Sequence, residues 1–72
     1  MISVAPENPW GHFYLGVCYF EIDELEKARS EFERVQALSP GIPVNQFNLA
    51  HTYIALEEFE PAIEVFKNIE GA

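Results

Sequence analysis

Hydrophobic residues recur every three or four positions in four separate stretches of this chain, which is the spacing of one face of an α-helix. The first stretch, from about residue 9 to residue 22, is apolar along two stripes. One stripe consists of Phe13, Val17 and Phe20, and the other of Leu15, Cys18, Tyr19 and Ile22. The later stretches are 23–38, 43–56 and a fourth that carries Phe59, Ala62, Ile63, Phe66 and Ile69. The pattern therefore predicts an all-α chain of four helices.

Turn and capping residues fall between these stretches. Asn8 followed by Pro9 predicts a helix N-cap with proline at the first helical position. Asp23 with Glu26 three residues later predicts a capping box that opens the second helix. The run Ser-Pro-Gly-Ile-Pro at 39–43 interrupts the helical pattern, so we expect the third helix to begin at Pro43.

The sequence repeats itself after 34 residues. At this shift nine pairs are identical, against roughly two or three expected by chance for ordinary compositions. They are Pro6 with Pro40, Pro9 with Pro43, Phe13 with Phe47, Leu15 with Leu49, Tyr19 with Tyr53, Glu24 with Glu58, Glu26 with Glu60, Ala28 with Ala62, and Phe32 with Phe66. Each unit holds two helical patterns, so we expect tandem antiparallel helical hairpins.

A unit of this length, with leucine and glycine followed by tyrosine, alanine, phenylalanine and proline, resembles the tetratricopeptide repeat. The first unit supplies Leu15, Gly16, Tyr19, Ala28, Phe32 and Pro40, and the second supplies Leu49, Ala50, Tyr53, Ala62 and Phe66. The frequent tryptophan of that pattern is replaced by His12 and Gln46. The small residues are expected where paired helices approach closely. On this resemblance 9–42 is one repeat, 43–72 is a second that stops before its closing proline, and 1–8 is the tail of a preceding repeat or an N-terminal extension.

The resemblance also implies a binding surface, because the first helix of each hairpin lines a concave groove in that family. The residues at matching positions are Trp10, Phe13, Val17, Phe20 and Glu21, then Val44, Phe47, Asn48, His51, Ile54 and Ala55. Members that grip a C-terminal carboxylate would carry lysine, asparagine and lysine where this chain has Phe13, Val17 and Val44. A partner with an apolar or amphipathic helix or peptide, and with basic residues at its edges, is the better match.

Composition narrows the class of protein. A chain of 72 residues makes one small domain with a marginal core, and its single cysteine excludes an internal disulfide. The net charge of -8 disfavours nucleic acid as a partner. No stretch has the length of a membrane span, and residues 1–9 lack the pattern of a signal peptide, so cytoplasmic localisation is favoured while the compartment stays open.

Candidate chemistry is sparse. His12 and His51 lie at different repeat positions, and Cys18 reads as a small buried hydrophobe. Carboxylates cluster at turns and helix starts, where helix dipoles favour them. We therefore predict no enzyme, no cofactor and no metal.

Two functions follow from these patterns. The first is an adaptor or scaffold that holds a protein partner in the groove. The second is an assembly unit, because each end of a two-hairpin stack lacks a neighbour. The expected stacking face of the second unit consists of Leu56, Phe59, Ile63 and Phe66. Through it the chain would form a homo-oligomer or part of a longer array.

Overall fold

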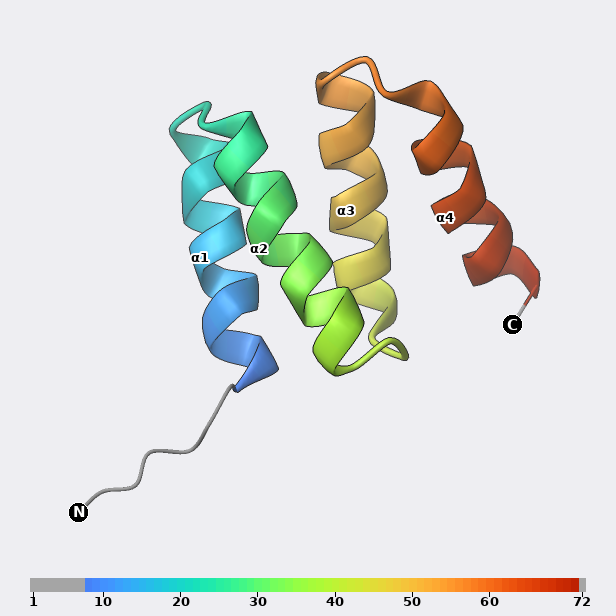
Figure 1. Cartoon of the computed structure of the whole chain (residues 1–72), viewed down its shortest axis with the longest axis horizontal. Coiled ribbons are helices and arrows are strands. Elements are labelled where there is room, and N and C mark those ends of the chain that lie inside the picture. The colour runs from blue at the N-terminus through green and yellow to red at the C-terminus, as the bar shows by residue number, and fades with distance from the viewer. Residues whose placement is uncertain (1–7, 72) are drawn as a thin grey trace.

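A computed structural model describes residues 8–71, with side chains for 8–69, and over that range it confirms four helices and no strand. The helices are α1 (Pro9–Glu21), α2 (Leu25–Leu38), α3 (Pro43–Ala55) and α4 (Phe59–Gly71). They lie side by side in chain order, and their connections alternate between the two ends (Figure 1). The prediction for 1–8 lies, apart from Asn8, outside the described residues, as does Ala72.

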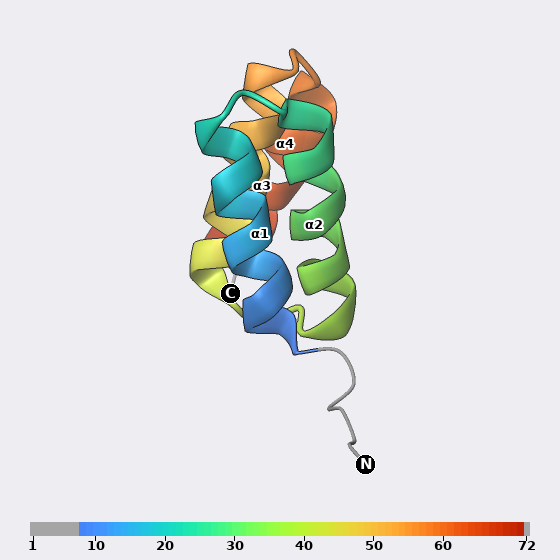
Figure 2. The same cartoon turned by 90° about the vertical axis from the view of Figure 1, so that its left-hand side faces the viewer.

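The helices form two antiparallel hairpins that share one interface. Helix α1 packs against α2, α3 packs against α4, and α2 packs against α3. Seen from the side, α1 and α3 lie toward one side of the molecule and α2 and α4 toward the other (Figure 2). The first helix of each hairpin therefore shares one layer with the first helix of the other, as a tandem repeat requires.

The N-terminal cap of α1 is confirmed. The side chain of Asn8 accepts a hydrogen bond from the backbone N–H of Trp10 at 3.0 Å, and Pro9 is the first helical residue. Since proline has no N–H, its place in the first turn leaves no unpaired donor. Helix α3 also begins with proline, at Pro43, but its N-cap residue Ile42 makes no side-chain capping bond.

The predicted capping box at Asp23 and Glu26 is wrong. Helix α2 begins at Leu25, and its cap has no side-chain hydrogen bond. Asp23 instead closes α1: it has a φ of 67°, its N–H bonds to the carbonyl of Phe20 at 3.0 Å, and the next N–H bonds to Tyr19 at 2.8 Å. This is the pattern of a Schellman motif, which needs a left-handed residue. A residue held in that conformation cannot take the extended backbone of an N-cap.

The core is built where small residues let the paired helices approach. A side chain at Gly16 would meet the ring of Phe32 at 2.7 Å, so glycine is what allows α1 and α2 to pack this closely. Three alanines, Ala28, Ala50 and Ala62, are also buried. The larger core residues around them are Phe13, Phe32, Val35, Leu49 and Tyr53. The close-approach role expected for Gly16 is confirmed, and the matching alanines lie inside the core.

Polar bonds hold the two hairpins together. The amide of Asn45 donates to the backbone carbonyl of Phe32 at 3.1 Å, and the hydroxyl of Tyr53 donates to Glu33 at 2.6 Å. Burial, followed by this bond to a carboxylate, raises the pKa of Tyr53 above its ordinary value. These bonds join α2 to the face of α3 that packs on it, so they fix how one hairpin sits on the next.

An ion pair adds to this interface. The guanidinium of Arg29 donates to the carboxylate of Glu58 at 2.8 Å, which raises the pKa of Arg29. Both side chains are partly exposed, so the ion pair adds little to the stability of the fold and mainly orients the two side chains.

The prediction that Cys18 is buried is wrong, because this cysteine is exposed. The residue 34 positions later, Thr52, is fully buried. Helix α2 covers that face of α3, whereas among the described residues no helix covers the matching face of α1. The same helical stripe is therefore inside in one hairpin and outside in the other.

Candidate functional site

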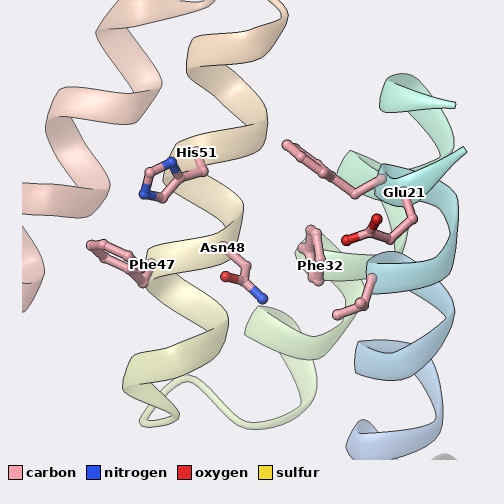
Figure 3. Close-up of a pocket in the computed structure, with 7 residues that line it drawn as sticks. Glu21, Phe32, Phe47, Asn48 and His51 are labelled. Carbon is pink, nitrogen blue, oxygen red and sulfur yellow. The ribbon is translucent and has the colours of Figure 1, made fainter. Parts of the chain in front are cut away.

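A hollow of about 320 Å³ opens between α1 and α3, and we call it the α1–α3 hollow. It is lined by Val17, Phe20 and Glu21 from α1, by Phe32 from α2, and by Phe47, Asn48 and His51 from α3. Figure 3 shows Glu21 and Asn48 on facing sides of this space, with Phe32 between them. The hollow is of the size at which small concave sites in proteins begin, and most of its walls are apolar.

The structure brings together part of the predicted groove. Val17, Phe20, Phe47, Asn48 and His51 all line the hollow, and Glu21 lies with them. The remaining predicted residues do not line it. They are Trp10, Phe13, Val44, Ile54 and Ala55.

Phe13 belongs to the core rather than to the surface, since only 7% of it is exposed. Its ring packs against Phe32 at a centroid distance of 5.8 Å and against Trp10 at 5.4 Å. Trp10, Val44 and Ile54 are exposed but lie beyond the hollow. A partner that filled the hollow would therefore meet the ring of Phe13 very little.

Phe47 is the most exposed aromatic wall of the hollow. Half of it, 50%, is accessible, although its ring packs edge-on against His51 at 4.5 Å and Phe66 at 6.2 Å between centroids. These contacts hold the ring in place on α3. A fixed, half-exposed aromatic ring is the kind of side chain that anchors protein interfaces.

Phe32 is the lining residue that sequence reasoning missed. It comes from the second helix of its hairpin and is almost fully buried, yet its ring forms part of the hollow. The signal lay in Gly16, because a glycine lets the ring of Phe32 pack close against α1, the helix that supplies three other lining residues. Only the pairing of α1 with α2 shows that the two residues meet.

Charge is distributed unevenly between the helices of each hairpin. Helices α1 and α3 together contain no lysine or arginine and a single carboxylate, Glu21. The four lysine and arginine residues lie on α2 and α4. The α1–α3 hollow thus presents apolar walls with one formal negative charge.

The predicted stacking residues of the second hairpin divide into two pairs. Phe59 and Ile63 are exposed on α4, at 55% and 52%. Leu56 is half-buried, and Phe66 packs on Phe47. Sequence reasoning did not include the other end of the stack, where Leu15 and Ile22 of α1 are also exposed.

The described part of the chain offers neither a membrane-spanning helix nor a cluster of metal ligands. None of its helices combines the length and apolar character that crossing a membrane requires. Within 8–71, no three side chains of histidine, cysteine, aspartate or glutamate come together as a metal site would need.

Comparison with known families gives two matches. Residues 9–42 match one family model described as "Tetratricopeptide repeat", and residues 45–69 match a second model with the same description. Together the two matched ranges span most of the chain. No curated protein and no solved structure matches it.

Proposed function

This chain belongs to the tetratricopeptide repeat family, and from that premise we propose that it is an adaptor that docks an apolar or amphipathic peptide or helix in the α1–α3 hollow. Repeats of this family are non-enzymatic modules that bind proteins or peptides. We propose no catalytic role and no cofactor for the chain.

The observation that carries this proposal is the pair of exposed aromatic side chains, Phe47 at 50% and Phe20 at 36%, in the hollow that Phe32 also lines. The rings of Phe20 and Phe47 expose apolar surface to water on the layer that α1 and α3 share. An apolar side chain placed there would bury that surface, with a gain of about 25 cal/mol for each Å² removed from water. The walls are preformed by core contacts, so little ordering of the protein is needed for binding.

The test uses two phenylalanines of similar exposure. Phe47→Ala removes a wall of the hollow, whereas Phe59→Ala removes an equally large exposed ring outside it. Binding of peptides selected against the unaltered chain is measured by fluorescence anisotropy, after circular dichroism shows that both variants are helical. We expect the peptide affinity to fall at least tenfold for Phe47→Ala and to change little for Phe59→Ala. Equal binding by both variants would contradict the groove assignment.

A second candidate function is self-association through the ends of the stack. It is favoured by the exposure of Phe59 and Ile63 at one end and of Leu15 and Ile22 at the other. The packing of α2 on α3 within the chain is a precedent for this contact. It joins the second helix of one hairpin to the first helix of the next, as α4 of one copy would meet α1 of another. A contact of this head-to-tail kind would extend the stack rather than close it.

Sedimentation separates the two functions. Self-association predicts an apparent mass that rises with concentration and falls back for Phe59→Ala combined with Leu15→Ala. A chain that stays monomeric over the whole concentration series would exclude assembly. A tight dimer that no longer binds the selected peptides would count against docking.

A further inference from the structure

The proposed docking site contains one carboxylate whose position its own helix does not explain. Glu21 is the last residue of α1, where the negative end of the helix dipole disfavours an acidic side chain. Within the described residues it forms no ion pair or side-chain hydrogen bond. Most other carboxylates of the chain lie in turns or on α2 and α4, but Glu21 lines the hollow.

Asn48 is the second polar group with no evident structural use. Its backbone carbonyl accepts a bond from Thr52, but its side-chain amide has no hydrogen bond within the described residues. The amide of the buried Asn45, by contrast, ties α3 to α2. Asn48 and Glu21 approach the hollow from opposite helices, with Phe32 between them (Figure 3).

Resting on the proposed docking function, we propose that the α1–α3 hollow selects a basic side chain, arginine or lysine, flanked by apolar residues of the bound peptide. The methylene stem of such a side chain would lie along Val17, Phe20 and Phe47. Its charged end would donate to the carboxylate of Glu21 and to the amide oxygen of Asn48. Arginine suits this arrangement better than lysine, because its planar group has several donors that can reach two acceptors at once.

The charge of the rest of the molecule supports this choice of partner. The net charge is -8 with histidine counted as neutral, and α1 and α3 contain no lysine or arginine that could neutralise Glu21. An acidic peptide would therefore meet repulsion both at long range and in the hollow. A wholly apolar peptide that covered the hollow would remove the carboxylate of Glu21 from water without giving it a partner, which costs binding free energy.

The first experiment is a selection of random displayed peptides against four forms of the full chain. They are the unaltered protein, Glu21→Gln, Glu64→Gln and Phe47→Ala. Glu64→Gln is the matched control, because it makes the same change of charge on α4, away from the hollow. Glu21→Gln should fold, since it removes a charge from the end of α1 that the helix dipole disfavours.

We expect arginine or lysine beside apolar residues to be enriched by the unaltered protein and by Glu64→Gln. Glu21→Gln should select apolar peptides without that enrichment. Basic residues enriched equally by Glu21→Gln, or by no form at all, would overturn the inference while leaving docking intact. Peptides that bind Phe47→Ala as well as the unaltered protein would instead overturn the docking site itself.

A second experiment measures the proposed contact directly. The most enriched peptide is synthesised with arginine and with citrulline, a neutral side chain of nearly the same shape. For the unaltered protein the change to citrulline should weaken binding about tenfold, as expected for a hydrogen bond to a charged group. For Glu21→Gln the same change should have less than about a twofold effect, since the two substitutions remove one shared interaction. Equal losses for both proteins would refute a contact between Glu21 and the basic residue.

Discussion

Leu15 and Leu49 occupy the same position of the two repeats, yet 45% of Leu15 is exposed and only 3% of Leu49. Tyr19 and Tyr53, four residues further on, differ in the same direction. The helices that carry them have equivalent sequences at these positions, and the difference lies in the neighbour. Helix α2 covers this face of α3, and no described helix covers the matching face of α1. A repeat therefore specifies which stripes of its helices can be buried, and the adjacent hairpin decides which of them are.

The largest effect that tests this comparison is the loss of the leucine side chain at each position. Leu49→Ala should lower the free energy of unfolding by about 3 kcal/mol, because it leaves a cavity between α2 and α3. Leu15→Ala should lower it by less than about 1 kcal/mol, since that side chain is largely in water already. Urea denaturation followed by circular dichroism measures both. Similar losses for the two variants would show that the face of α1 is covered in solution, as self-association predicts.

The second test exchanges glycine and alanine at the equivalent positions 16 and 50 of the two hairpins. Gly16→Ala puts a methyl group against the buried ring of Phe32, and the strain should exceed the gain in helix propensity by about 1 kcal/mol. Ala50→Gly should also destabilise, by about 1 kcal/mol, because alanine already fits there and glycine is a poor helix former.

Gly11→Ala is the control for this exchange, since nothing lies near a methyl group placed there. It should raise the thermal midpoint slightly, again through helix propensity. A stabilising Gly16→Ala would mean that α1 and α2 are not packed as closely as the structure has them.

The third test concerns the two tyrosines. Tyr53→Phe removes the bond to Glu33 between the hairpins and should cost about 1 kcal/mol, whereas Tyr19→Phe should cost almost nothing. The raised pKa of Tyr53 means that the folded chain holds this proton more tightly than the unfolded chain. The contribution of Tyr53 is therefore complete below about pH 10 and is lost as the pH rises through the folded pKa.

Denaturation at neutral pH and above about pH 10 measures this dependence. The free energy of unfolding of the unaltered protein should exceed that of Tyr53→Phe by less at the higher pH. Its difference from the free energy of unfolding of Tyr19→Phe should stay small at both pH values. An advantage over Tyr53→Phe that does not change with pH would contradict a buried, hydrogen-bonded hydroxyl.

The smallest expected effect on stability concerns the C-terminal ends of α1 and α3. Asp23 and Glu57 both close the first helix of a hairpin in the left-handed conformation, with φ values of 67° and 63°. Aspartate tolerates this conformation better than glutamate does, and glycine adopts it most readily. We expect Glu57→Gly to raise the free energy of unfolding by about 0.5 kcal/mol and Asp23→Gly to raise it less. Thermal denaturation measures both, and a loss of stability for Glu57→Gly would contradict the left-handed cap.

Local pattern was enough to predict most of the fold. Apolar periodicity located the helices, prolines and the 39–43 run marked the breaks, and Asn8 marked the first cap. These signals act within a few residues of the chain, so sequence alone contains them. The capping box failed because Asp23 had two possible local roles, and closing α1 excluded opening α2.

The candidate site was less predictable because it depends on contacts between helices. The resemblance to the tetratricopeptide repeat implied that the first helix of each hairpin lines one groove, and Phe20, Phe47 and Asn48, named on that basis, do line the hollow. It did not indicate that Phe13 turns into the core or that the ring of Phe32 reaches the hollow. Those outcomes depend on how α1 packs against α2, which is a property of two helices together.

The sequence by itself determined four helices, a 34-residue period and the small residues that allow each pair to pack, because all of these are written in spacing and residue size. Tertiary structure decided which stripe of each helix is buried, how Asp23 is used, and which side chains meet across the α1–α3 hollow. The physical reason is that burial is a property of contacts. A stripe of apolar residues is removed from water only when another helix lies against it, and the stripe does not encode where that helix will be.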